Sequence, residues 1–161
     1  TLPHLEPLLR AGIDALPQDR PVVITGSGLS AADAAQERLV AYGAATAALA
    51  ASGTVSLELA AAGTPMVIAY DMGLISRLVI GAMLKVDTVT LVNLVSETRA
   101  VPEFIGKDCK AERIAPALLQ ILNAPARQAE AIETTMMRLG RGDPELPYRA
   151  ARAVLDGLKK A

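Results

Sequence analysis

Short runs of apolar residues recur along the chain, each bounded by glycine, proline or polar residues. Runs of this length without alternating polar positions fit strands that are buried on both faces, as in a parallel sheet. The pattern therefore predicts four strands, over residues Pro21–Thr25, Ala47–Ala51, Pro65–Tyr70 and Val89–Val92.

Segments with apolar residues at three- to four-residue spacing separate these strands and predict helices. Ser30 is a suitable N-cap for the second helix, in which Leu39 and Val40 are expected to face inward, and Gly63 is suited to end the third. Strands that alternate with helices indicate an α/β fold with a doubly wound, Rossmann-like parallel sheet. The expected helices lie at about Leu2–Ile13, Ala31–Ala41, Val55–Ala62 and Leu74–Leu84.

Beyond Arg99 the alternation stops, and the pattern predicts helices alone, at about Ala111–Leu122, Ala126–Leu139 and Tyr148–Lys160. Two parts are therefore expected. Residues 1–105 form a partial Rossmann-like domain, and residues 106–161 form C-terminal helices that cover the sheet or reach a neighbouring domain.

Composition narrows the class of protein. With 161 residues, of which 52% are hydrophobic, the chain is long enough to bury one domain-sized core. Its net charge of −1 offers no basic surface for a nucleic acid. Cys109 is the only cysteine, and no His or Cys lies at metal-ligand spacing from it. A disulfide, a metal site and a cofactor are therefore not expected.

The sequence predicts neither a membrane-spanning segment nor a secretory leader. Its longest apolar run, Leu78–Leu84, is far shorter than the roughly 18 residues that a bilayer requires. The residues after Thr1 follow a helical pattern rather than that of a signal peptide. A cytoplasmic location is the expectation.

The turn after the second predicted strand has the features of an anion site, because ligands of open parallel sheets bind where strands end. Gly53 lets the backbone approach a ligand closely, Ser52 is placed to cap the next helix, and the first N–H groups of that helix favour a pyrophosphate. Glu58 lies four residues after Thr54 on the same helical face, where its carboxylate can accept hydrogen bonds from ribose hydroxyls. On spacing alone, an ordinary strand-to-helix turn with a solvated glutamate explains the same residues.

Two residues further along are candidates for the same site. Asn93 is expected at the end of the fourth strand, where its amide can contact a sugar or nucleotide, although a turn-forming Asn fits the position too. Arg99 can pair with a phosphate through parallel hydrogen bonds, although a solvated loop arginine is the alternative.

The residues around the turn also resemble a known family. Ala48–Ala60 and Ala62–Tyr70 closely resemble the central motif of lipid-A-disaccharide synthases, and the likeness covers about residues 40–122. It continues through Leu91–Val95, Arg99, Val101–Glu103 and the predicted helix near Ile114–Leu122.

The resemblance implies a bacterial glycosyltransferase of the two-domain GT-B type, with this chain as the C-terminal, donor-binding part. By resemblance, Ser52, Gly53 and Thr54 hold the UDP diphosphate and Glu58 holds the ribose. The implied reaction transfers 2,3-diacylglucosamine from its UDP donor to 2,3-diacylglucosamine 1-phosphate, with release of UDP. The implied location is the cytoplasmic face of the inner membrane of a Gram-negative bacterium, and a homodimer is compatible with it.

Two departures limit what the resemblance implies. Asp71 stands where the family usually has a basic residue after the Tyr of the third strand, so the cation expected near the cleft is missing. The family's expected catalytic base belongs to its other domain. No catalytic residue is therefore assigned to this chain, and on its own the chain is expected to be inactive.

Alternatives stay open at this point. The chain also fits another UDP-sugar enzyme of the same architecture, such as a peptidoglycan transferase or an epimerase, or a non-catalytic α/β interaction module. The predicted helix Leu74–Leu84 is apolar, and its nearest charges are Arg77 within it and Lys85 directly after it. It fits either a buried core helix or a surface that meets the membrane and acyl chains.

Overall fold

The computed structural model describes Pro7 and residues 28–51, 53–71 and 87–158. The chain divides into two compact units, Thr1–Ala45 and Thr46–Ala161, and each is described by itself. The helix predicted at Leu2–Ile13, the strand predicted at Pro21–Thr25 and the helix predicted at Leu74–Leu84 lie outside the described residues, apart from Pro7, which is helical. The division into residues 1–105 and 106–161 stays a prediction.

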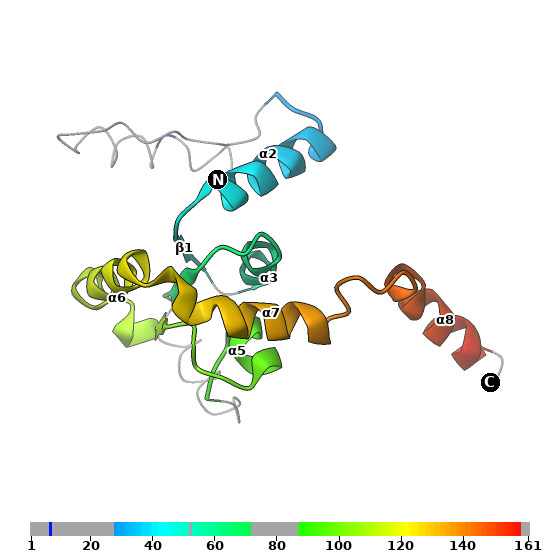
Figure 1. The fold of residues 1–161 in the computed structure, drawn as a ribbon. Helices are drawn as coiled ribbons and strands as arrows, with labels where there is room; N and C mark the ends of the chain where they lie inside the picture. The colour runs from blue at the N-terminus through cyan, green and yellow to red at the C-terminus, as the bar shows by residue number, and fades with distance from the viewer. Residues whose placement is uncertain (1–6, 8–27, 52, 72–86, 159–161) are drawn as a thin grey trace. The chain divides into compact units, whose positions relative to one another are not determined.

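In the first unit, helix α2 spans Ala31–Ala44 (Figure 1). It begins as predicted, because the Ser30 hydroxyl oxygen accepts the N–H of Asp33 at 3.2 Å and satisfies a free donor of the first turn. The expectation that Leu39 and Val40 face inward is wrong, since they are 47% and 62% exposed. Being adjacent, the two side chains point about 100° apart on the helix and form no apolar stripe along it.

Among the described residues of the second unit, three parallel strands form a sheet in the order β1-β2-β3 (Figure 1). Their bounds are Ala48–Ala50 for β1, Met66–Tyr70 for β2 and Glu103–Ile105 for β3. Ala50 lies opposite Ile68, and Ile68 lies opposite Glu103, so β3 begins at the level where β1 ends. The predicted class, a parallel Rossmann-like α/β fold, is confirmed.

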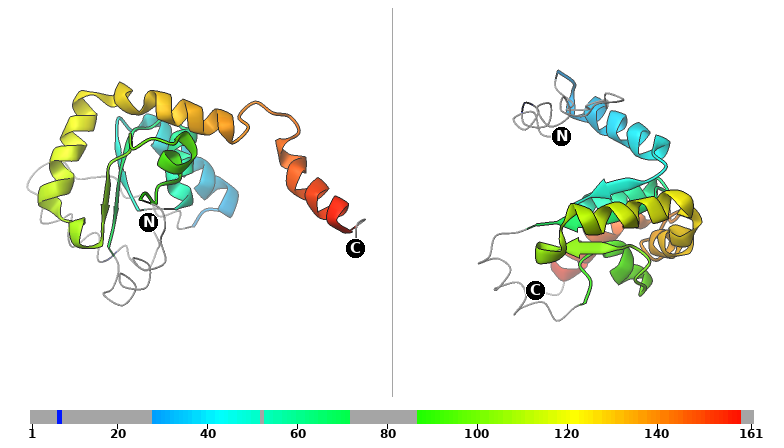
Figure 2. Two further views of the ribbon diagram at one scale, coloured as in Figure 1. Left: turned by 90° about the horizontal axis from the view of Figure 1, so that it is seen from below. Right: turned by 90° about the vertical axis from the view of Figure 1, so that its left-hand side faces the viewer.

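Helices lie on both faces of this sheet. Helix α6 (Ala111–Asn123) packs on one face, where Ile114 and Ile121 contact Val67. Helices α3 (Thr54–Ala61) and α5 (Leu91–Ser96) lie on the other face and contact each other (Figure 2). Helix α7 (Ala129–Arg138) runs from the α6 side toward α3 and α5 past the amino ends of the strands (Figure 2).

The other elements in the described part of the chain are η2 (Gly106–Asp108), η3 (Pro125–Gln128) and α8 (Leu146–Leu158). The helices predicted at about 55–62, 111–122, 126–139 and 148–160 are thus confirmed, with η3 and α7 sharing the third of them. The buried apolar core consists of Leu59, Ala60, Met66, Val67, Ile68, Val92, Val101, Ile114, Ile121, Ala131, Ile132 and Met136.

Polar side chains at the two ends of α7 attach this helix to the sheet and to helices α5 and α3. The amide of Gln128 accepts the N–H of Met66 at 3.0 Å and donates to the Met66 carbonyl at 2.9 Å. Arg138 donates to the carbonyl of Val95 at 2.6 Å, near the end of α5. Arg141 donates to the carbonyl of Ala61 at 3.0 Å, at the end of α3. Because the last carbonyls of a helix lack intrahelical partners, these arginines cap α5 and α3.

Two predictions between β2 and α6 are wrong. The segment Val89–Val92, predicted as a strand, has no strand structure, and α5 begins within it at Leu91. The region beyond Arg99, predicted to be purely helical, contains strand β3. The cause lies in Glu103, whose carboxylate accepts the N–H groups of Val89 at 3.3 Å and Thr90 at 2.7 Å. A side chain thus takes the backbone donors that a neighbouring strand would need.

Candidate functional site at the carboxyl edge of the sheet

The turn between β1 and α3 has a backbone conformation that only glycine adopts readily. Gly53 is the N-cap residue of α3, with φ 131° and ψ −157°. An added Cβ would meet nothing within 4 Å there, so the need for glycine is conformational rather than steric. Ser52, predicted to cap this helix, lies outside the described residues, and the N-cap position belongs to Gly53. The first N–H groups of α3 therefore have no side-chain cap from Gly53, which leaves them suited to an anion.

The first turns of α3 separate an inner from an outer face. Ser56 and Leu59 are buried, whereas Thr54 is exposed and Glu58 is partly exposed. The Ser56 hydroxyl donates to the Gly53 carbonyl at 2.7 Å and thereby ties the helix to the turn. The predicted placement of Thr54 and Glu58 on one face, one turn apart, agrees with this burial pattern.

The ends of β2 and β3 bring further polar side chains to the same edge of the sheet. Tyr70, the last residue of β2, lies opposite Ile105, the last residue of β3. Tyr70 and the following Asp71 are exposed, as is Lys107, which follows β3 in η2. Neither Tyr70 nor Lys107 was predicted from the sequence as a site residue. Lys107 was missed because β3 was not predicted, and its position one residue after Gly106 becomes informative only once that strand is known.

Asn93 does not lie at the end of a strand, as predicted, but inside α5, where it is 1% exposed. Its Oδ1 accepts the N–H of Val101 at 2.9 Å, and its Nδ2 donates to the Val101 carbonyl at 2.9 Å. The same Nδ2 lies 3.3 Å from Thr88 Oγ1 and 3.3 Å from a carboxylate oxygen of Glu103. The amide thus holds the approach to β3 in place.

Glu103 is the acceptor at the centre of this group of side chains. Burial alone would raise the pKa of its carboxyl, but hydrogen bonds from the Thr88 side chain and from the N–H groups of Thr90 and Val89 outweigh burial and hold the pKa below its ordinary value of 4.5. The described donors to this carboxylate are backbone N–H groups and uncharged side chains, so the carboxylate organises the backbone around it. We therefore interpret the Glu103 cluster, defined as Thr88, Asn93, Val101 and Glu103, as structural.

Arg99 is paired with a carboxylate of the protein. Its Nε donates to Asp87 at 3.1 Å, and its Nη2 also bonds Asp87, which lowers the pKa of that carboxyl chiefly through this hydrogen bond. Arg99 precedes β3, whereas Gly53 follows β1. In a parallel sheet, the amino ends of the strands and their carboxyl ends lie at opposite ends of the sheet. The structure therefore does not bring Arg99 to the turn.

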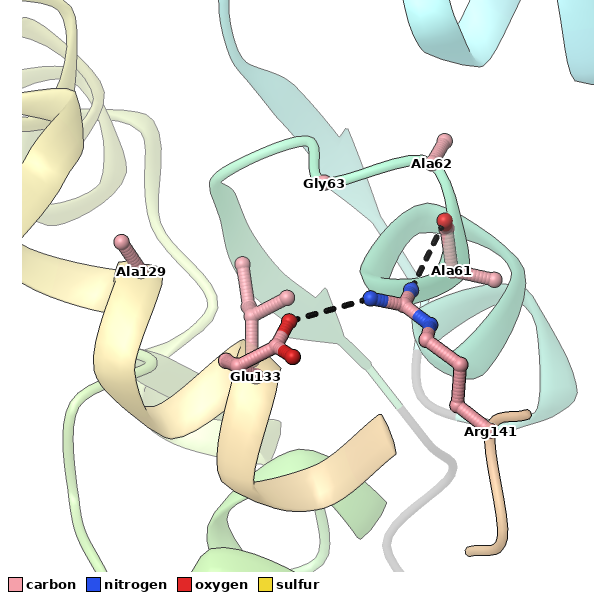
Figure 3. A pocket seen from close by; sticks show the side chains of 7 residues that line it. Ala61, Ala62, Gly63, Ala129, Glu133 and Arg141 are labelled. Carbon is pink, nitrogen blue, oxygen red and sulfur yellow. Dashed lines mark hydrogen bonds and ion pairs between the residues drawn. The ribbon is translucent and has the colours of Figure 1, made fainter. Parts of the chain in front are cut away.

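A surface pocket of about 390 Å³ lies at the other end of α3 (Figure 3). It is lined by Ala61, Ala62 and Gly63 on one side and by residues of α7 on the other, with Arg141 between them. Arg141 donates to Glu133 at 3.1 Å and to the Ala61 carbonyl, so its guanidinium is already engaged by the protein (Figure 3). The pocket is therefore separate from the turn at the carboxyl edge.

Within the described residues, no group of three or more His, Cys, Asp or Glu side chains is placed to hold a metal ion. In the same part of the chain, no helix has both the length and the apolar character needed to cross a membrane.

Comparisons with known proteins agree with the resemblance seen around the turn. The family profile described as lipid-A-disaccharide synthetase matches residues 25–145. The lipid-A-disaccharide synthase of Ruegeria pomeroyi is 50% identical over 138 residues, which cover 86% of this chain and 34% of that protein. That of Bradyrhizobium diazoefficiens is 39% identical over 163 residues, which cover 99% of this chain and 39% of that protein. The chain thus spans between a third and two fifths of the length of these relatives.

Proposed function

The chain belongs to the lipid-A-disaccharide synthetase family, and from this premise we propose that it is the donor-binding part of a glycosyltransferase of lipid A biosynthesis. The reaction proposed is the transfer of 2,3-diacylglucosamine from UDP to 2,3-diacylglucosamine 1-phosphate. The observation that carries the proposal is the turn at Gly53, which presents the start of α3 at the carboxyl edge of a parallel sheet.

In this proposal the donor lies along the outer face of α3. The N–H groups of its first turn and the exposed Thr54 bind the diphosphate, with Ser52 contributing from the turn. Glu58, one turn further along the same face, accepts hydrogen bonds from the ribose hydroxyls. We assign no ligand contact to Asn93 or Arg99, because the amide of the first is bonded to Val101 and the guanidinium of the second to Asp87.

The chemistry proposed breaks the bond between C1 of the donor sugar and the diphosphate, and forms a bond from C1 to the acceptor hydroxyl oxygen. The diphosphate leaves with the electron pair of the broken bond, and the start of α3 stabilises its growing charge. The proton of the acceptor hydroxyl must pass to a base. We assign that base to none of the residues of this chain, and catalysis to the longer protein of the family.

The acylated substrates imply contact with a membrane surface, which we propose to be peripheral. The apolar segment Leu74–Leu84, the candidate for that contact, lies outside the described residues. A homodimer likewise stays a prediction. Donor competition separates the proposal from its rivals, because only a lipid A enzyme should prefer an acylated UDP-sugar, and a non-catalytic module should bind no nucleotide.

The test of the proposed site is a calorimetric titration of UDP into the protein encoded by the complete gene. We expect Glu58→Ala to weaken UDP binding at least about tenfold, because hydrogen bonds to a charged group contribute about 1.5–3 kcal/mol each. Glu130→Ala, which removes an exposed glutamate of α7, is the matched control and should change affinity less than about twofold. Arg99→Ala should behave like the control.

Two results would count against the proposal. If folded wild type fails to bind UDP, the turn is no nucleotide site. If Glu58→Ala binds UDP as tightly as Glu130→Ala does, Glu58 is not the ribose ligand.

A further inference from the structure

We propose that the ring of Tyr70 is the surface on which the sugar of the donor rests, and hence a specificity-determining residue of the transferase. This inference rests on the proposed function and names a residue that the diphosphate and ribose contacts do not include.

The register places Tyr70 beside the turn that follows β1. Ile68 lies opposite Ala50, the last residue of β1, and Tyr70 is two residues further along β2. Two residues of strand advance about 7 Å, so Tyr70 stands at the level of the turn that leads into α3. Adjacent strands are about 4.8 Å apart. Tyr70 is therefore the nearest residue of the neighbouring strand to the predicted diphosphate site.

The pleat of β2 also sets the face on which the ring lies. Side chains of a strand alternate between faces, and Val67 packs against α6 on one face of the sheet. Tyr70 has the opposite parity and shares it with Met66 and Ile68, so its side chain belongs to the face that carries α3. The ring and the first turn of α3 thus lie on the same side of the sheet.

Tyr70 is unusual among the residues of β2 in its exposure. Met66, Val67 and Ile68 are each 0% exposed, whereas Tyr70 is 44% exposed. An aromatic ring that ends a buried strand at the ligand-binding edge of a sheet offers an apolar surface to one side and a hydroxyl to water. Ligand pockets are commonly lined by aromatic side chains of this kind.

The order of groups in a sugar nucleotide decides which group meets this ring. With the diphosphate at Thr54 and the ribose at Glu58, the nucleoside extends along α3 toward its carboxyl end. The sugar is attached to the other side of the diphosphate and must therefore extend past the amino end of α3, over the edge of the sheet. Tyr70 occupies that edge. The C–H bonds of a sugar ring carry partial positive charge and pack well on the negative face of an aromatic ring.

The experiment compares UDP with UDP-2,3-diacylglucosamine that carries short, water-soluble acyl chains, by calorimetry on the protein encoded by the complete gene. Tyr70→Phe keeps the ring, whereas Tyr70→Leu keeps apolar volume without a ring. We expect Tyr70→Leu to weaken the sugar nucleotide about tenfold and UDP less than about twofold. Tyr70→Phe should bind both ligands within about threefold of wild type. Leu119→Ala, an exposed apolar residue of α6 on the other face, should change neither.

The outcomes separate this inference from the function on which it rests. Failure of folded wild type to bind UDP removes the proposed function itself. Normal binding of the sugar nucleotide by Tyr70→Leu overturns the role of the ring while leaving that function intact. An equal loss for UDP and the sugar nucleotide would place the effect on the turn rather than on the sugar and would also overturn the inference. Circular dichroism confirms that each variant is folded.

Discussion

Asn93 and Val101 are joined by two hydrogen bonds, one in each direction, between the side-chain amide of the first and both backbone groups of the second. The amide takes the place that a neighbouring strand would occupy, two residues before β3 begins. The side-chain amide of Gln128 likewise forms hydrogen bonds with both backbone groups of Met66 at the start of β2. Two buried amides therefore complete the hydrogen bonding at the amino side of the sheet, where short strands leave backbone groups unpaired.

Removal of the Asn93 amide should destabilise the protein. Asn93→Ala leaves the N–H and the carbonyl of Val101 buried without these partners, and an orphaned buried group costs about 1–3 kcal/mol. We expect a decrease of about 3 kcal/mol in the free energy of unfolding, measured by urea denaturation. Asn123→Ala, at an exposed position in the last turn of α6, is the control and should stay within about 0.5 kcal/mol.

The same variant also tests the ligand contact that was predicted for Asn93 from its expected place at the end of a strand. If Asn93→Ala is as stable as wild type but loses affinity for UDP, the amide is a ligand contact rather than a structural one. A stability loss with UDP affinity retained in the folded fraction is the outcome that its burial supports.

The pH dependence of stability should report Glu103. Hydrogen bonds lower the pKa of its carboxyl in the folded state, so its contribution is fully present above the ordinary value of 4.5 and is lost as the pH falls through the lowered pKa. Glu103→Gln should lose about 1–3 kcal/mol of unfolding free energy at pH 7, because a neutral amide accepts these hydrogen bonds poorly. The difference from wild type should shrink as the pH is lowered below about 4.5.

Urea denaturation of both proteins between pH 7 and pH 3 measures this difference. Glu130→Gln at an exposed position is the control and should follow the wild-type curve. A difference between Glu103→Gln and wild type that stays constant over the whole range would show that the ionised carboxylate is not the stabilising form.

The sequence predicts β1, α3 and β2 well because each is specified locally. Apolar runs bounded by Gly53 and Gly63 define both strand and helix limits, and burial then follows from periodicity. β3 could not be predicted in this way, because a three-residue strand that begins with Glu103 shows no apolar run. Its glutamate is satisfied by donors 10 to 15 residues away in the chain, which no local pattern reveals.

The residues of the candidate site also differ in whether local sequence or tertiary structure places them. Gly53, Thr54 and Glu58 follow from one strand, one turn and one helix, so spacing alone could select them. Asn93 was predicted at the end of a strand that does not exist, and Arg99 was predicted to pair with a phosphate from a loop. Their actual partners, Val101 and Asp87, are set by tertiary structure. Tyr70 became a candidate only when the register of the sheet was known, since the pairing of Ala50 with Ile68 places Tyr70 two residues beyond the end of β1, at the level of the turn.

The backbone conformation of Gly53 should make the turn sensitive to substitution by alanine. An L-residue at φ 131° and ψ −157° is strained by about 1–3 kcal/mol, whatever space surrounds it. Gly53→Ala should therefore either lose that much unfolding free energy or move the turn to an ordinary φ, which redirects the first N–H groups of α3. Both routes weaken UDP binding, and we expect a decrease of at least about tenfold by calorimetry.

Gly157→Ala provides the contrast, because Gly157 lies inside α8 without a left-handed φ and with nothing within 4 Å of an added Cβ. That substitution should leave UDP affinity unchanged and should leave stability equal or up to about 1 kcal/mol higher, since alanine favours helix. If Gly53→Ala instead keeps both wild-type stability and wild-type UDP affinity, the turn does not need its left-handed backbone. The start of α3 would then have to bind the diphosphate without the backbone orientation on which the proposed site depends.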